Sequence, residues 1–206
     1  LLLAAFVALL LVAPFVLYPQ FLIEIMCFAL LAAALNLLVS YCGLLSFGHA
    51  MFFGAAGYVT AQAIKVWGLD PALGILCGVA VAVVIGALTG SLAIRRQGIY
   101  FSMITLALAQ LIYFFALRMP FTGGEDGLTF RVPELLSPGF TLSEEPLVTP
   151  LGEVDLNGRL ITYYLIFLAV TAIFLTILRI VNSPFGRVLQ AIRENDFRAE
   201  ALGYRT

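Results

Sequence analysis

Residues 71–94 read PALGILCGVAVAVVIGALTGSLAI, a run without one charged side chain. A helix needs about 20 consecutive apolar residues to cross the hydrocarbon core of a bilayer, and this run is long enough. Small residues recur in it at every fourth position: Gly74, Gly78, Ala82, Gly86 and Gly90. Such a stripe lets the backbone of a neighbouring helix approach closely. We therefore expect a membrane-spanning helix that packs against other parts of the protein.

Similar apolar runs occur along most of the chain. Together with the first, the candidate spans are residues 1–17, 21–40, 44–64, 71–94, 98–117 and 160–180. The composition agrees, because 62% of the residues are hydrophobic and 11% are charged, whereas soluble domains carry about 45–50% apolar and about 25% charged residues. We predict an all-α, polytopic transmembrane helix bundle of about six spans, folded as a single membrane domain over residues 1–206.

The ends of the chain suggest a fragment, because the sequence starts at Leu1 rather than at Met and stops at Thr206 directly after a charged segment. The first apolar run has a second interpretation as a signal peptide. No small-residue cleavage site follows its leucines, and Pro14 and Pro19 fit the end of a helix better.

The arginines predict the orientation in the membrane, because basic connections stay on the cytoplasmic side. They gather at residues 95–96 and again over 179–205, and both regions should be cytoplasmic. Residues 119–159 hold seven acidic side chains against two basic ones, a local charge of −5. We expect residues 119–159 to form an extracytoplasmic loop and residues 183–206 to form a cytoplasmic segment. The protein would then be a multi-pass protein of a bacterial-type inner membrane.

Residues 41–58 read YCGLLSFGHAMFFGAAGY, an apolar run interrupted by glycines and by Ser46 and His49. Irregular backbone at membrane depth survives only where it is buried in protein or lines a watery cavity. The N-termini of broken helices can also face the anionic group of a substrate. Ser46, Gly48 and His49 are therefore candidates for a substrate path. The alternative is that the glycines serve helix packing and that His49 donates one interhelical hydrogen bond.

Gln110 lies near the middle of the fifth run, where an unpaired amide is costly, so it should face the interior of the bundle. It is a further path candidate, although pairing with a neighbouring helix would satisfy it equally well. Ser102 and Thr105 lie on the same helix three residues apart and add a mildly polar strip.

The sequence offers little for catalysis, metal binding or nucleotide binding. Its one histidine is His49, and Cys27, Cys42 and Cys77 stand singly in apolar surroundings, without metal-ligand spacing. The TGGEDGL stretch at 122–128 reads as a turn, because its acidic pair lacks a third ligand. Neither GxxxxGK[ST] nor GxGxxG occurs. We predict no catalytic residue, no metal site, no cofactor and no nucleic-acid partner for this chain.

Residues 182–205 read NSPFGRVLQAIRENDFRAEALGYR. Ser183 followed by Pro184 is a good N-cap and first-turn pair, and the apolar residues that follow repeat at helical spacing. A second short helix would run from Asn195 or Asp196 to a stop at Gly203. The pattern fits a helix that docks on a partner protein, and it also fits a generic basic surface helix.

Four stretches together resemble the M-type permease subunit of branched-chain amino-acid ABC importers. They occur in that family's order and are GLLSFGHAMFFGAAGY, RRQGIYFSMITLALAQ, TGGEDGL and SPFGRVLQAIRENDFRAEALGY. The resemblance implies a second permease subunit, two cytoplasmic ATPase subunits that bind ATP, an extracytoplasmic substrate-binding protein, and further membrane helices after Thr206. It also implies that residues 194–203 couple to the ATPase. The coupling candidates are Glu194, Arg198, Glu200, Ala201 and Gly203.

The resemblance implies import of leucine, isoleucine and valine through a subunit that is not itself an enzyme. The same machinery importing urea, short amides or another small polar solute remains an alternative. A secondary transporter would place an ionisable residue at the membrane midplane, for which only Glu24 and His49 are near candidates. A purely structural membrane scaffold is the remaining class.

Overall fold

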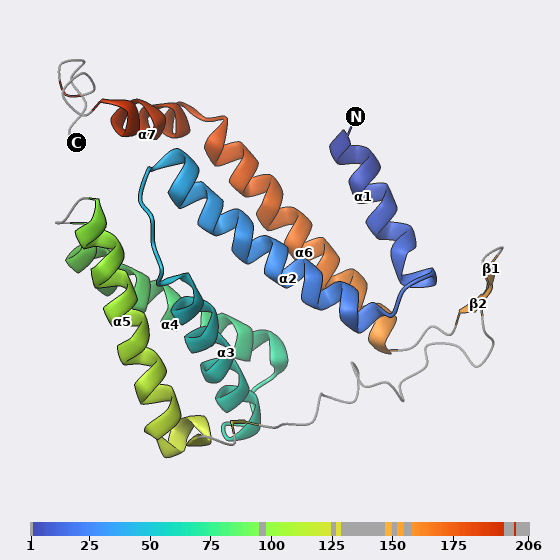
Figure 1. The fold of residues 1–206 in the computed structure, drawn as a ribbon. Helices are drawn as coiled ribbons and strands as arrows, with labels where there is room; N and C mark the ends of the chain where they lie inside the picture. Colours follow the sequence, from blue (N-terminus) through green and yellow to red (C-terminus); the bar gives the residue numbers. More distant parts are fainter. Residues whose placement is uncertain are drawn as a thin grey trace. The chain divides into compact units, whose positions relative to one another are not determined.

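The computed structural model describes residues 2–94, 98–124, 127–128, 147–149, 152–154, 158–195 and 200. Helices make up most of these residues (Figure 1). In chain order they are α1 (Leu2–Val12), η1 (Ala13–Phe15), α2 (Pro19–Asn36), η2 (Leu37–Tyr41), α3 (His49–Lys65), α4 (Pro71–Ala93), α5 (Ile99–Arg118), η3 (Pro120–Thr122), α6 (Gly158–Val181) and α7 (Pro184–Glu194). Two short antiparallel strands, β1 (Leu147–Thr149) and β2 (Gly152–Val154), pair in the stretch expected to be an extracytoplasmic loop.

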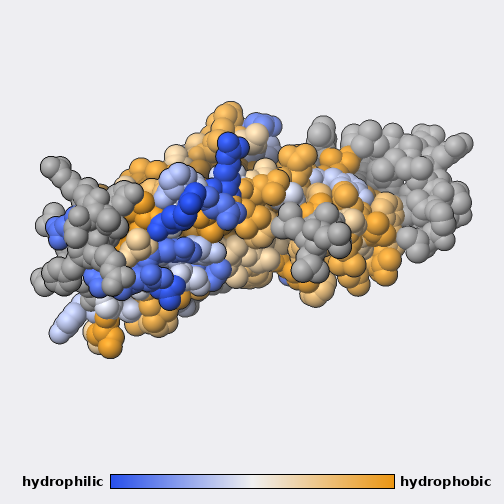
Figure 2. Space-filling model, turned by 90° about the horizontal axis from the view of Figure 1, so that it is seen from above, coloured by the Kyte–Doolittle hydropathy of each residue, from blue (hydrophilic) through white to orange (hydrophobic). Residues whose placement is uncertain are grey.

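Among the described residues, 4 helical segments are long and apolar enough to cross a membrane. They are Pro19–Tyr41, Pro71–Ala93, Ile99–Arg118 and Leu160–Val181. Large apolar side chains on them are exposed, for example Leu76 at 62% and Leu168 at 71%. Figure 2 shows hydrophobic residues over much of one face of the molecule. Such a surface suits lipid as the surrounding solvent, so the predicted all-α transmembrane fold is confirmed.

The remaining two predicted spans are shorter than expected. The first helix, α1, has 11 residues and ends at Val12, because Pro14 lies in the 3₁₀ turn η1 that follows. The third predicted span was wrong at its start, because α3 begins at His49 rather than at residue 44 and has 17 residues. Gly43 lies just before the predicted start and has φ +72, which a helix cannot include.

The chain folds as two compact units. The first comprises Leu1–Ala33 and Val132–Arg179, and its core is built from Leu22 and Met26 of α2 and Tyr163 and Phe167 of α6. Tyr163 is fully buried, and its hydroxyl donates to the carbonyl of Leu10 at 2.6 Å. This bond satisfies one of the orphan carbonyls at the C-terminal end of α1.

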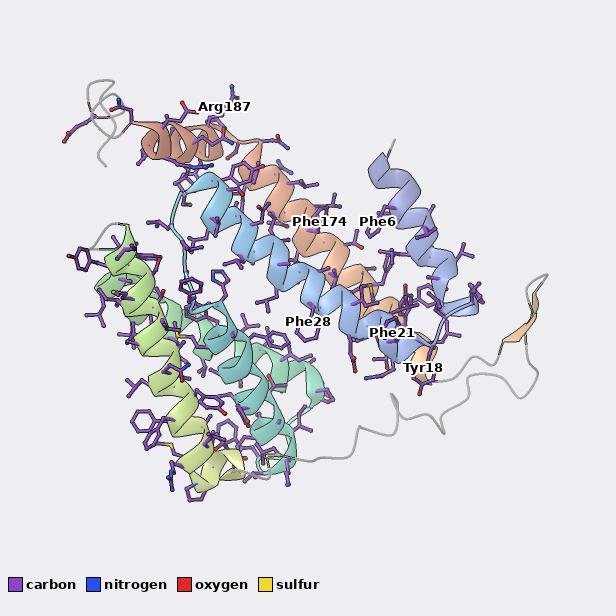
Figure 3. All side chains as sticks on the ribbon, in the orientation of Figure 1. Phe6, Tyr18, Phe21, Phe28, Phe174 and Arg187 are labelled. Atoms are coloured by element: carbon purple, nitrogen blue, oxygen red, sulfur yellow. The ribbon has the colours of Figure 1, made fainter. Side chains whose placement is uncertain are left out.

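A hollow of about 140 Å³ also lies in the first unit, between α1, α2 and α6. Phe6 of α1 and Phe174 of α6, both labelled in Figure 3, are among the residues that line it. Its lining is almost entirely apolar, which is typical of loosely filled helix packing.

The second unit comprises Ala34–Arg131 and Ile180–Thr206, and a close hairpin of α3 and α4 forms part of it (Figure 1). Asp70 caps α4, because its carboxylate accepts from the N–H of Ala72 at 3.3 Å. Gly74 and Gly78 are buried, and a Cβ at Gly78 would lie 2.7 Å from the carbonyl oxygen of Ala56. The predicted small-residue packing is therefore confirmed at these two glycines. Gly90, further along the stripe, has no atom within 4 Å of a Cβ position.

Candidate functional site

Residues 42–48 are non-helical and join η2 to α3 in the second unit; residues 43–48 of this segment are called the break. Side chains of α5 bind its backbone. The hydroxyl of Ser102 donates to the carbonyl of Leu45 at 2.6 Å, and the N–H of Phe47 donates to the Thr105 hydroxyl oxygen at 3.3 Å. Because these backbone groups are paired within the protein, the segment can remain irregular without bonds to water.

Ser46 and Gly48 lie where the break meets α5. Ser46 is 6% exposed, and its hydroxyl oxygen accepts from the N–H of Gly48 at 3.2 Å. Gly48 is buried, and a Cβ there would lie 3.1 Å from the carbonyl oxygen of Thr105. The lack of a side chain at Gly48 therefore allows the break to lie directly against the backbone of α5.

His49 begins α3, and its ring meets the ring of Phe52 edge-on, with centroids 6.1 Å apart. Its Nδ1 atom is buried and has no hydrogen-bond partner within the part of the chain that the structure describes. The interhelical hydrogen bond considered for His49 is therefore not seen among those residues. No three metal-ligating side chains come together in the described ranges. His49 is left with a polar atom able to accept or donate one further hydrogen bond.

Gln110 lies on the wall of a cavity of about 410 Å³ bounded by α3, α4, α5 and η3. The polar side chains in this wall are those of Tyr58, Gln110, Tyr113 and Thr122. The remaining lining is aliphatic, aromatic, glycine or methionine. Among the described residues that line the cavity, none is charged. The cavity thus combines a large apolar surface with a few dipoles.

The sequence-predicted path residues fall into two places. Ser46, Gly48 and His49 belong to the break and the start of α3, whereas Gln110 belongs to the cavity wall. Phe47 connects the two places, because its backbone bonds Thr105 and its side chain lines the cavity.

The sequence pattern marks Ser102 and Thr105 only as a polar strip and does not place Tyr58 or Tyr113 among the path candidates. A signal for Tyr113 was present, because it follows Gln110 by three residues and so lies on the same face of α5. No comparable spacing connects Tyr58 of α3 to this face.

The predicted cap of the C-terminal segment is confirmed. The hydroxyl oxygen of Ser183 accepts from the N–H of Gly186 at 3.3 Å, and Pro184 occupies the first turn of α7. Of the coupling candidates, Glu194 is exposed at the end of α7 and Glu200 is exposed in helical conformation. Arg198, Ala201 and Gly203 lie outside the described residues, as does most of the predicted second short helix.

Comparison with known proteins adds independent information. The family described as "Branched-chain amino acid transport system / permease component" matches residues 17–206. The high-affinity branched-chain amino acid transport system permease protein LivM of Escherichia coli (strain K12) is 26% identical over 193 residues, which are 86% of this chain and 44% of that protein. The LivM protein of Salmonella typhimurium is 27% identical over 192 residues, with the same coverage. The chain thus spans about half the length of these curated relatives. No solved structure matches the chain.

Proposed function

The chain belongs to the family of permease components of branched-chain amino acid transport systems, and on that premise we propose that it is a membrane-spanning subunit of an ABC importer. Its substrates are leucine, isoleucine and valine, and its site of action is the bacterial-type inner membrane. The names of the relatives from Escherichia coli and Salmonella typhimurium support this substrate class.

The observation that carries the proposal is the break before α3. Its backbone groups are bound by Ser102 and Thr105 of α5, which keeps an irregular segment stable where lipid would leave it unpaired. Helices interrupted in this way form the substrate sites of many transporters, because half-helix N-termini and free backbone groups meet the solute there. The unpartnered Nδ1 of His49 stands at the start of such a half-helix.

The cavity beside the break suits a zwitterionic amino acid with an apolar side chain. Its volume of about 410 Å³ lies within the range of about 300–1,000 Å³ usual for small-molecule sites. The apolar walls complement a branched aliphatic side chain, and the dipoles of Gln110, Tyr58 and Tyr113 can pair with the polar end of the solute. A fixed charge in the wall would hold the solute too tightly for release.

Energy for import comes from separate subunits in this proposal. Two cytoplasmic ATPase subunits bind ATP, a second permease subunit completes the path, and an extracytoplasmic binding protein delivers the solute. This chain binds no cofactor itself. Residues 194–203, with Glu194, Arg198, Glu200, Ala201 and Gly203, dock on the ATPase and carry its conformational change to the membrane helices.

Uptake by the full-length protein with its partner subunits in proteoliposomes tests the proposal. We expect labelled leucine, but not labelled urea, to accumulate when ATP and the binding protein are supplied. Accumulation of urea or a short amide without leucine would replace the substrate assignment. Accumulation of either solute under an ion gradient alone, without ATP, would contradict the ABC mechanism and favour a secondary transporter.

A further inference from the structure

Arg193, in the last turn of α7, reaches the end of η2, and both lie in the second compact unit. Its Nη1 donates a hydrogen bond to the carbonyl of Ser40. Its aliphatic stem lies against one side of the exposed Gly43, because a Cβ at Gly43 would lie 2.8 Å from the Cγ of Arg193. In Figure 1, α7 lies beside the C-terminal end of α2, where η2 follows.

The contact gives a hydrogen-bond donor to a backbone carbonyl near the end of η2. The last carbonyls of a helix have no partner within the helix, and a cationic side chain there is favoured by the negative end of the helix dipole. The hydroxyl of Ser40 donates to the side-chain oxygen of Asn36 at 2.6 Å. The backbone carbonyl of Ser40 accepts from Arg193. Gly43 has φ +72, so it both ends the helix and leaves space for the arginine stem.

The contact stands at the entrance to the break. Immediately after Gly43, the N–H of Leu44 donates to the carbonyl of Leu38 at 3.2 Å, and the carbonyl of Leu45 accepts from Ser102. Phe47 then bonds Thr105 and lines the cavity. Hydrogen-bonded backbone groups therefore occur along the chain from Ser40, which α7 contacts, to Phe47 at the cavity wall.

We propose that Arg193 is a positioning residue that fastens α7 to the start of the break, and that movement of α7 reaches the solute path through this contact. The coupling part of this inference rests on the proposed function. Coupling requires an element whose state is influenced both by the ATPase-docking segment and by the solute path. The contact itself is independent of which solute is carried.

Cys42, between Ser40 and Gly43, provides a native reporter of the contact. It is a free, partly buried thiol, so loosening of Arg193 should expose it. In the full-length complex in nanodiscs, with Cys27 and Cys77 replaced by alanine, we expect Arg193→Ala to raise the rate of Cys42 alkylation about fivefold. This is the change that corresponds to the loss of one exposed hydrogen bond of about 1 kcal/mol. Arg193→Lys keeps a cation and an aliphatic stem and should restore most of the protection.

Arg187→Ala is the matched control, because Arg187 is an exposed arginine of the same helix, labelled in Figure 3. It should leave Cys42 alkylation at the wild-type rate. Gly43→Ala changes the second partner of the contact. It should raise the rate of Cys42 alkylation as Arg193→Ala does, since the added Cβ displaces the arginine stem.

The same preparations give solute imported per ATP hydrolysed. We expect this ratio to fall about threefold in Arg193→Ala, because a weaker contact between α7 and the break lowers the coupling free energy between the ATPase and the solute path. Unchanged Cys42 alkylation would overturn the contact, and raised alkylation with an unchanged ratio would overturn its role in coupling. If the wild-type complex imports no branched-chain amino acid, the proposed function fails, while the alkylation rates still decide whether Arg193 holds the break.

Discussion

Gly48 is the residue on which the approach of the break to α5 depends. We expect Gly48→Leu to impair assembly or transport, because its Cβ would already lie 3.1 Å from the Thr105 carbonyl oxygen and the rest of the side chain has to displace α5. Overpacking of this kind costs about 1–3 kcal/mol. The measurement is leucine uptake normalised to protein level, together with the thermal midpoint in detergent.

Gly57→Leu is the control for Gly48→Leu, because it makes the same substitution in α3 at a position with no atom within 4 Å of the Cβ site. It should retain both uptake and stability. Wild-type behaviour of Gly48→Leu would place Gly48 away from a tight contact.

Tyr163 shows how one hydroxyl joins helices that are distant in sequence. It is fully buried and donates to the carbonyl of Leu10 at 2.6 Å, so Tyr163→Phe leaves that carbonyl without its partner. We expect a loss of about 1–3 kcal/mol in the free energy of unfolding. Tyr164→Phe removes a longer bond of 3.1 Å to Leu11 in an exposed setting and should cost less. Chemical unfolding of the full-length protein in detergent compares the two, and an equal loss would contradict the ranking.

The hairpin of α3 and α4 depends on close contact between backbones. Gly78→Ala should weaken it, because the added Cβ would lie 2.7 Å from the Ala56 carbonyl oxygen and against the Thr60 hydroxyl. We expect a destabilisation of about 1–3 kcal/mol. Gly90→Ala in the same helix meets open space, so it should be neutral or stabilise α4 by about 0.5–1 kcal/mol through its better helix propensity. Thermal midpoints of the two variants measure the difference, and coincident midpoints would argue against the close packing.

Variants in the coupling segment at 194–203 should affect binding of the ATPase rather than folding. Ala201→Glu places a charge on the proposed docking face, and Gly203→Pro replaces a helix stop by a residue with φ near −65°. Charges in an exposed segment contribute only about 0–1 kcal/mol to folding, so both variants should insert normally but lose co-purification with the ATPase and solute-stimulated ATP hydrolysis. If Gly203→Pro alone is silent, Gly203 is dispensable; if Ala201→Glu is silent too, the docking assignment fails.

The orientation of the protein in the membrane can be tested through the acidic stretch at 119–159. A cysteine introduced at Ser143, in a background without Cys27, Cys42 and Cys77, should react with a membrane-impermeant thiol reagent in intact cells. Reaction only after the cells are broken would reverse the predicted topology. A cysteine at Gln190, on the exposed surface of α7, should show the opposite pattern and serves as the internal control.

Much of the fold followed from local patterns in the sequence. Four predicted spans are present as long apolar helices, because the cost of exposing polar groups to lipid acts on each segment separately. The cap at Ser183 and Pro184 is equally local, since its donor and acceptor are three residues apart. The glycines within residues 41–58 also predicted an irregular backbone, but they did not predict that α3 begins at His49.

The contacts that organise the candidate site join residues remote in the chain. Ser102 and Leu45 are 57 positions apart, and Tyr163 and Leu10 are 153 apart, as are Arg193 and Ser40. A glycine permits a break, but the side chains that satisfy the freed backbone groups depend on which helix packs beside it. The sequence therefore determined the helices, the turns that end them and the family. Tertiary packing decided where α3 starts and which hydroxyls bond the break, and it also placed an arginine of α7 on the carbonyl of Ser40, just before the break.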